Sequence, residues 1–346
     1  ISSYLDRRGY YTELIRLNRE VLELEPDKDS MNWIAQAYAH QMDLENAAQW
    51  YKKALDMAPD AISYQGLGMI RLDQGEHDQA EESLEKALQM HLDQKDLRGE
   101  AAVLQALASI DVARKSSSAA KDKLERAARI LEDLGDIMGV AAVLQEMANI
   151  DMMQGHWDSA RPRLARSLQL AREAKDRAGE AVLLFNLADV DREAGELGRA
   201  TEELGRALAI TRDLGDRKGI AVSLHGLGMI SSQAGDKEKA AEHFLEALQV
   251  YQELKDQPGE AGALFQLGAL AVQMDRVQDG LRLMALSAVV LRSINSDEVK
   301  SIEPVVERLA SQLNYSQEQF MAMLQEVMRS YVKDRGMGLV KKAWRK

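Results

Sequence analysis

Several residue types are missing or scarce in this chain of 346 residues. It contains no cysteine, which excludes disulfide bonds and thiolate metal sites and is compatible with a reducing compartment. It has only five prolines and 5% aromatic residues, and few prolines favour long helices. No apolar run reaches the roughly 18 residues of a membrane-spanning helix, and no signal peptide is found. We therefore expect a cytoplasmic protein without a membrane span.

The chemical motifs of common enzymes are also missing. The chain has no GxxxxGK[ST] loop, no HExxH helix and no GxSxG turn, and without cysteine it has no thiol nucleophile. Its histidines are scattered, and none lies at metal-ligand spacing from another: His40, His77, His91, His156, His225 and His243. We therefore expect no catalytic residues, no metal site and no cofactor, and we predict that the chain is not an enzyme.

The charge is strongly acidic but unevenly spread. A net charge of −12 favours solubility and argues against nucleic acid as the main partner. Two clusters, which we name the basic stripes, stand out: Arg114, Lys115, Lys121, Lys123, Arg126 and Arg129, then Arg161, Arg163, Arg166, Arg172, Lys175 and Arg177. The last six residues, KKAWRK, are basic too. Phosphate or nucleic-acid binding by the stripes stays open as an alternative function.

The chain does contain one sequence motif that recurs five times at intervals of 40 residues. KDLRGEAAVLQALA begins at Lys95, GDIMGVAAVLQEMA at Gly135 and KDRAGEAVLLFNLA at Lys175. GDRKGIAVSLHGLG begins at Gly215 and KDQPGEAGALFQLG at Lys255. Self-similarity at a fixed period predicts stacked repeats, each of which buries its apolar face only against its neighbours.

Within each repeat the apolar residues follow helical spacing. We number each repeat from the alanine two residues after the glycine of the motif. Position 1 is therefore Ala101, Ala141, Ala181, Ala221 and Ala261, with Ala61 one step earlier. Positions 4 and 7 are bulky, and position 8 is small. Glycine at position 15 predicts a turn, and small residues at 20 and 27 with a bulky one at 24 predict a second helix. Each repeat is therefore expected to be a helical hairpin.

This residue order resembles the tetratricopeptide repeat, and the 40-residue period resembles its long-helix subgroup, which includes Pins-type adaptors, kinesin light chains and bacterial regulators. The resemblance implies an all-α, right-handed superhelical solenoid of stacked hairpins with a C-terminal helical cap. We expect conventional units over residues 1–60, the 40-residue array over 61–290, and capping helices with a basic tail over 291–346. Ile1 falls at position 7 of a truncated first unit, so we expect a piece of a longer protein.

Three local features carry their own expectations. An aspartate precedes each repeated first helix and predicts an N-cap rather than a catalytic group: Asp96, Asp136, Asp176, Asp216 and Asp256. The glycine three residues later is expected where neighbouring backbones crowd. The turn KSSSA lacks the usual glycine and predicts a longer polar loop, with phosphorylation at 116–118 as the alternative. Ser296 or Asp297 is expected to cap the first helix after the array.

The family resemblance also implies a concave groove lined by positions 2, 5, 9, 12 and 13. The candidate partner-binding residues on it are Gln65, Met69, Gln105, Gln145, Asn149, Met152, Phe185, Asp189, Arg192, His225, Met229 and Phe265. Met and Phe are expected to seat apolar anchors of a peptide or amphipathic helix, and the amides to bind its backbone. The alternative is that several of them pack between repeats. The lysines of a carboxylate-binding clamp are missing from position 5.

The leading hypothesis is a non-enzymatic scaffold that binds a protein or peptide partner in this groove. The alternative is a sensor or regulatory arm of a larger bacterial signal-transduction protein. The sequence indicates no oligomeric state. We expect Phe185→Ala combined with Met229→Ala to abolish partner binding and leave melting unchanged.

Overall fold

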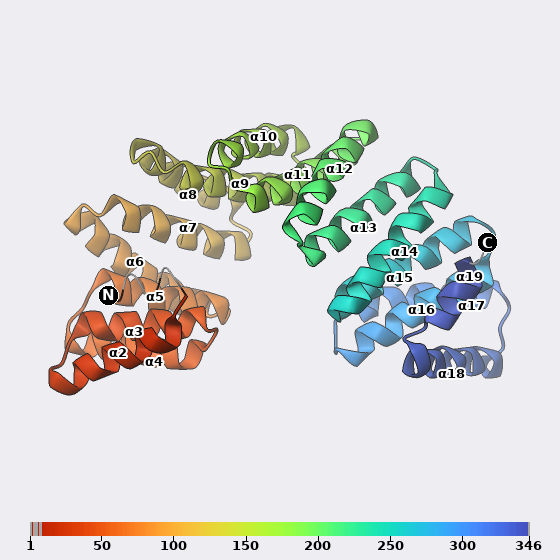
Figure 1. The fold of residues 1–346 in the computed structure, drawn as a ribbon, viewed down its shortest axis with the longest axis horizontal. Coiled ribbons are helices and arrows are strands. Elements are labelled where there is room, and N and C mark those ends of the chain that lie inside the picture. The colour runs from red at the N-terminus through yellow and green to blue at the C-terminus, as the bar shows by residue number, and fades with distance from the viewer. Residues whose placement is uncertain (1, 3–5, 7–8, 345–346) are drawn as a thin grey trace. The chain divides into compact units, whose positions relative to one another are not determined.

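The computed structural model describes residues 2, 6 and 9–344 of the chain (Figure 1). Its regular elements in this part are all α-helices, as predicted. Contacts between residues divide the chain into unit 1, residues 1–156, and unit 2, residues 157–346, and each unit is described by itself. Ile1, at which the expected truncated repeat begins, and the last two residues of the basic tail lie outside the described residues.

Unit 1 consists of helices joined by short turns. They are α2 (Tyr11–Leu24), α3 (Lys28–His40), α4 (Leu44–Met57), α5 (Ala61–Asp73), α6 (His77–Gln94), α7 (Leu97–Ala113), α8 (Ser117–Asp133) and α9 (Ile137–Met153). The pairs α3 and α4, α5 and α6, and α7 and α8 pack as hairpins, and each hairpin packs on the helix that follows it. The unit is therefore a stack of helical hairpins (Figure 1).

Unit 2 continues the pattern and adds a cap. Its helices are α10 (Trp157–Glu173), α11 (Arg177–Glu193), α12 (Leu197–Leu214), α13 (Arg217–Gln233), α14 (Lys237–Leu254), α15 (Gln257–Gln273), α16 (Val277–Ser293), α17 (Val299–Gln312), α18 (Gln317–Asp334) and α19 (Met337–Trp344). Helices α11 to α16 form three hairpins, and α17, α18 and α19 all pack against α16. One apolar cluster runs from Ala188 to Ala343, so the last helices close the core of the array.

The start of α17 corrects one expectation. Its N-cap is Glu298, which makes no side-chain cap hydrogen bond, so neither Ser296 nor Asp297 is the cap. The Ser296 hydroxyl instead accepts from the backbone N–H of Glu298 at 3.3 Å. A turn at residues 297 and 298 delays the helix, which places both predicted caps one or two residues too early.

Small residues let the two helices of a hairpin approach closely. Gly228 lies against the Phe244 ring, where an added Cβ would stand 2.6 Å from a ring carbon. A Cβ on Gly68 would stand 2.7 Å from Leu84 Cγ. At both sites a glycine at position 8 faces a bulky side chain at position 24, which any larger residue at position 8 would displace.

The turns between the helices follow one geometry. Gly75, Gly155, Gly195 and Gly235 all have positive φ, as position 15 predicted. In the KSSSA turn, Lys115 takes the same left-handed conformation with φ 62°, and α8 begins at Ser117. The expected longer loop is wrong, because a lysine adopts here the conformation that glycine adopts in the other repeats.

The repeated aspartates cap the helices as predicted. Each accepts a hydrogen bond from the backbone N–H of the glycine three residues later, at 2.9 to 3.1 Å. The reason for that glycine differs from the expectation. A Cβ added to Gly259 would stand 2.3 Å from the Tyr251 ring, and one added to Gly179 would stand 2.2 Å from Asp176 Oδ2. The space at these glycines is therefore limited by side chains and not by a neighbouring backbone.

Candidate functional site

A cavity of about 240 Å³ opens between α11 and α13 in unit 2. Five of the twelve predicted groove residues line it: Phe185, Asp189, Arg192, His225 and Met229. Apolar walls complete it, contributed by Ala188, Leu204, Val222 and Ile230. Because the five come from positions 5, 9 and 12 of successive first helices, the spacing inferred from sequence brings them together in space.

The charged groups of this cavity are paired, whereas the buried Nδ1 of His225 has no hydrogen-bond partner among the described residues. Arg192 bonds Asp189 at 2.7 Å and Glu193 at 2.6 Å, all on α11. Burial lowers the pKa of His225, so its imidazole is neutral at pH 7. The His225 ring meets Phe244 edge-on at 5.3 Å. The cavity therefore offers a partner mainly apolar surface with one internally neutralised charge pair at its rim.

A second cavity of about 250 Å³ continues this surface toward the start of the same helices. It shares Phe185 and Val222 with the first and adds Val182 and Leu214. Val182 is 51% exposed and Leu214 is 49% exposed. Adjacent exposed apolar side chains of this kind are typical of binding surfaces. We name the residues of these two cavities the unit 2 groove.

Unit 1 contains an equivalent cavity of about 200 Å³ between α7 and α9. Its lining occupies positions 8, 9, 12 and 24 of one repeat and positions 6, 9, 10 and 13 of the next, and consists of Ala108, Ser109, Val112, Leu124, Glu146, Asn149, Ile150 and Met153. In the unit 2 cavity, positions 8, 9, 12 and 24 are Ala188, Asp189, Arg192 and Leu204. The two cavities are thus repeat-related, and of the predicted residues Asn149 lies in this one.

The other predicted residues are not gathered at a cavity. Gln65 Oε1 lies 3.1 Å from His91 Nε2, and Gln105 Nε2 donates to Glu146 Oε1 at 3.0 Å, so both amides already have partners within unit 1. Met69 is 49% exposed, and Gln145 and Met152 are half-buried. Phe265 packs partly against the core of unit 2, as do Phe185 and Met229.

Sequence reasoning missed the sixth position of the first helices. Glu146, Gly226 and Gln266 all occupy it and all line cavities. The available signal was that this position varies freely, through glycine, alanine, glutamate, asparagine and glutamine, whereas positions 4, 7 and 8 do not. Tyr251 and Leu204, which belong to second helices, also line the unit 2 cavity.

Several residues of the basic stripes form ion pairs that join helices. Lys123 bonds Asp111 at 2.5 Å, and Lys121 bonds Asp151 at 2.6 Å, where both aspartates occupy position 11. Arg114 bonds Asp78 and Glu81, Arg126 bonds Glu100, and Arg172 bonds Glu180. The stripes therefore meet acidic groups of their own chain within each unit.

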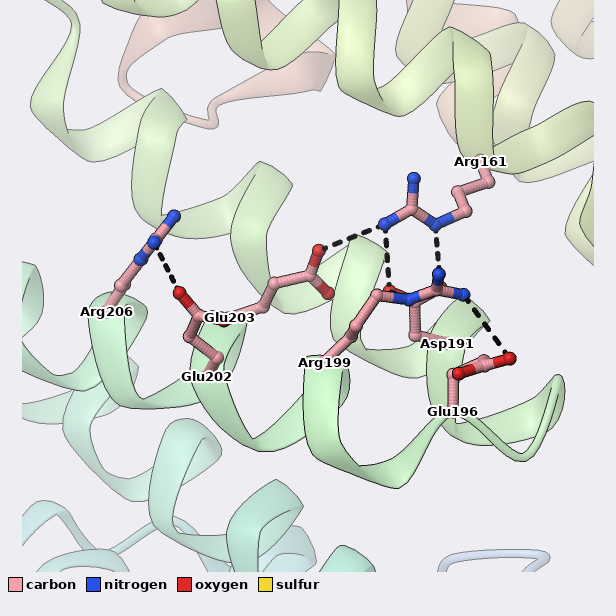
Figure 2. Close-up of polar contacts among 7 residues, drawn as sticks. All are labelled: Arg161, Asp191, Glu196, Arg199, Glu202, Glu203 and Arg206. Atoms are coloured by element: carbon pink, nitrogen blue, oxygen red, sulfur yellow. Dashed lines mark hydrogen bonds and ion pairs between the residues drawn. The ribbon is translucent and has the colours of Figure 1, made fainter.

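Figure 2 shows the densest of these networks, around Asp191 at position 11 of α11. Arg161 from α10 forks onto the Asp191 carboxylate with bonds of 2.7 and 3.1 Å. Arg199 from α12 approaches the same carboxylate at 3.3 Å. The Asp191 side chain is fully buried, so the two arginines supply the charge that its burial requires.

Glu203 completes the network at 3.7 Å from Arg161 (Figure 2). Burial and the neighbouring Asp191 carboxylate raise the pKa of Glu203 to about 7. Arg161 and Arg199 act in the opposite direction but do not offset the desolvation. This carboxyl therefore titrates near neutral pH.

The described residues contain no group of three or more His, Asp or Glu side chains that could hold a metal ion. A search of the same residues for a helix long and apolar enough to cross a membrane finds none.

Comparison with known protein families identifies the repeat. A family model described as tetratricopeptide repeat matches residues 29–90, 59–133 and 139–213, and a second model of the same description matches residues 220–254. The chain belongs to the tetratricopeptide repeat family. The matches cover more than half of the chain and name no enzyme family, and proteins built from this repeat bind protein or peptide partners.

Solved structures share the fold at low sequence identity. The apo form of RapI is similar with a TM-score of 0.69 and 16% identity, over 96% of this chain and 97% of that one. A Rap protein complexed with Competence and Sporulation Factor is similar with a TM-score of 0.57 and 14% identity, over 91% of this chain and 99% of that one. Identities this low establish the tetratricopeptide repeat fold alone.

A third similar structure is a signal transduction ATPase with numerous domains from Pyrococcus horikoshii, which carries a tetratricopeptide repeat sensor. Its TM-score is 0.72 at 12% identity, and the match covers 99% of this chain and 53% of that protein. No curated protein sequence matches this chain.

Proposed function

We propose that this tetratricopeptide repeat protein is a non-enzymatic scaffold that binds a peptide or helix of a partner protein in its groove. The observation that carries the proposal is the unit 2 groove, where five residues selected from repeat spacing surround one cavity. Phe185 and Met229 are only partly buried there, which leaves apolar surface for a partner's side chains. We place the protein in the cytoplasm, in keeping with its lack of cysteine.

The test is selection of peptides from a displayed random library on the full chain. We expect enriched peptides to carry large apolar residues and to lose binding at least tenfold in the variant Phe185→Ala, Met229→Ala. Unlike the expectation from sequence, this variant should also melt at a lower temperature, because both side chains contact the core of unit 2.

The core variant Leu184→Ala separates the two effects. Leu184 is 1% exposed and lines neither cavity of the unit 2 groove, so its truncation destabilises the fold without altering the groove surface. Selected peptides should still bind Leu184→Ala at temperatures where it is folded. Equal loss of binding in both variants would mean that the groove residues act through stability alone.

The second candidate is a sensor or regulatory arm of a larger signal-transduction protein. Its support is the similarity, over 99% of this chain, to an ATPase whose repeats are described as a sensor. The full reading frame at the genomic locus distinguishes the two candidates, because an adjoining ATPase or effector domain would favour the arm.

A further inference from the structure

The cavity between α7 and α9 differs from its unit 2 equivalent in its charged groups, because it lacks the pair Asp189 and Arg192 and has one carboxylate of its own. At position 6 of α9 it has Glu146, where the unit 2 cavity has Gly226 at position 6 of α13. One carboxylate oxygen of Glu146 accepts from Gln105 Nε2 at 3.0 Å. No cation pairs with Glu146 among the described residues, and the nearby Lys121 bonds Asp151 and Gln154 instead.

An uncompensated carboxylate in such a place is unusual. Glu146 is half-buried, and desolvation raises its pKa despite the hydrogen bond from Gln105. Two more deeply buried carboxylates of the same unit, Asp111 and Glu100, each have an ion-pair partner. A cationic ligand would supply what the chain itself does not provide.

The rest of the lining specifies the shape of that cation. Val112, Leu124 and Ile150 form apolar walls, which suit an aliphatic stem. Ser109 and Asn149 add oxygen acceptors beside the carboxylate, and the Ser109 hydroxyl donates its own proton to the Gln105 carbonyl at 3.2 Å. An ammonium group carries three donors, and three side chains here can accept them.

We propose that this cavity binds the side chain of a lysine from a partner protein. Its volume of about 200 Å³ accommodates one long side chain. Lysine is favoured over arginine because Gln105 occupies one Glu146 oxygen, which leaves a poor match for the two-pronged guanidinium. The inference rests on the proposed function, since it identifies one residue of the partner that the cavity between α7 and α9 recognises.

The probe is N-acetyl-lysine N-methylamide, titrated into the full chain with 13C-labelled methionine methyl groups. Met153 lines the cavity and is 75% exposed, so its methyl resonance reports occupancy. We expect that resonance to move with a dissociation constant of about 1–10 mM, as befits a single side chain. The isosteric norleucine and the arginine compounds should bind at least fivefold more weakly.

Glu146→Gln should weaken lysine binding at least tenfold and keep the melting temperature, because glutamine retains the shape and can still pair with Gln105. The matched control is Glu132→Gln, an exposed residue of α8, which should bind as the unaltered chain does. Equal binding of norleucine, unchanged binding by Glu146→Gln, or no Met153 shift up to about 50 mM probe would each overturn the proposal.

The outcome is separable from that of the proposed function. Phe185→Ala, Met229→Ala alters unit 2 only, so it should leave the Met153 titration unchanged. Loss of lysine binding in unit 1 with intact peptide selection would remove this inference alone. Intact lysine binding without any selected peptide would remove the proposed function instead.

Discussion

A single aspartate fixes where each first helix of the 40-residue repeats begins. The Asp136 carboxylate accepts from the Gly139 N–H at 3.0 Å, which satisfies one of the donors that a helix start leaves unpaired. The cap recurs at every repeated junction, and at four of the five a Cβ added to the glycine three residues later would stand less than 3.0 Å from the aspartate or from an aromatic ring. Local chemistry at this residue therefore sets the register of the whole repeat.

We expect Asp136→Ala to destabilise the chain by about 1 kcal/mol, the usual cost of a lost cap. The melting temperature should fall by about 2–4 °C. Thermal unfolding followed by circular dichroism measures this, with Asp122→Ala as the control because that exposed residue of α8 caps no helix. An equal change in both variants would show that the cap hydrogen bond contributes nothing specific.

Glu203 makes stability depend on pH. Its pKa rises from 4.5 in an ordinary environment to about 7 in the fold, through burial and the facing Asp191, against the pull of Arg161 and Arg199. Between these two pH values the folded chain keeps a proton that the unfolded chain releases. The contribution of this group to stability is therefore favourable at low pH and is lost as pH rises from 4.5 to 7.

Glu203→Gln should accordingly stabilise the chain at pH 8, by roughly 1–3 kcal/mol. At pH 4 to 5 it should have little effect, because the natural carboxyl is then protonated in the fold. Urea unfolding at the two pH values measures both quantities. The neighbouring Glu202→Gln is the control, since Glu202 is 63% exposed and pairs with Arg206 on the same helix (Figure 2). A gain that is the same at both pH values would contradict this account.

At the scale of elements, ion pairs fasten one hairpin to the next. Arg161 joins α10 to α11 through the buried Asp191, whereas Arg166 on the same helix bonds only Gln169 within α10. Removing Arg161 leaves Arg199 as the remaining cation at Asp191. The carboxylate would then be only partly compensated.

We expect Arg161→Ala to cost about 1–3 kcal/mol, less than a fully buried pair because Arg199 remains and Arg161 is itself accessible to water. Hydrogen exchange in α10 and α11 should accelerate. Arg166→Ala on the solvent face of α10 should leave exchange in both helices nearly unchanged. Similar protection in the two variants would mean that apolar packing alone fastens α10 in place.

The helices and their turns follow from the sequence because each repeats a local rule. Position 15 takes a left-handed conformation whether it is Gly155 or Lys115, and position 8 packs against the side chain at position 24 in each repeat where position 8 is glycine. Five of the groove residues could be placed at one cavity for the same reason. Because the repeats share one residue pattern, a structural rule inferred for one repeat predicts the same positions in the others.

Features that break the repeat could not be predicted in this way. Position 6 lines cavities in several repeats, but the carboxylate of Glu146 and its hydrogen bond from Gln105 belong to one repeat only. The cap of α17 moved because a turn follows the array, where the period no longer applies. Both depend on contacts between particular side chains, and the period carries no information about them.

At the scale of the whole molecule, the charge distribution bears on the kind of partner. The net charge is −12, and several residues of the basic stripes that interrupt it are bound to carboxylates on neighbouring helices. A phosphate backbone would have to displace those carboxylates, and it would meet an acidic surface elsewhere. A basic partner would instead be attracted, in keeping with the proposed lysine cavity.

We therefore expect no binding of fluorescent duplex DNA or single-stranded RNA at about 0.15 M salt, with a dissociation constant weaker than about 100 µM. Fluorescence anisotropy at this and at lower salt measures it. Asp78→Ala with Glu81→Ala releases Arg114 from both of its partners and should strengthen any weak low-salt binding, because it exposes one cation and removes two anions. Tight binding to the unaltered chain, with an affinity falling steeply and linearly on a logarithmic salt scale, would mean that the stripes yield their ion pairs to phosphates.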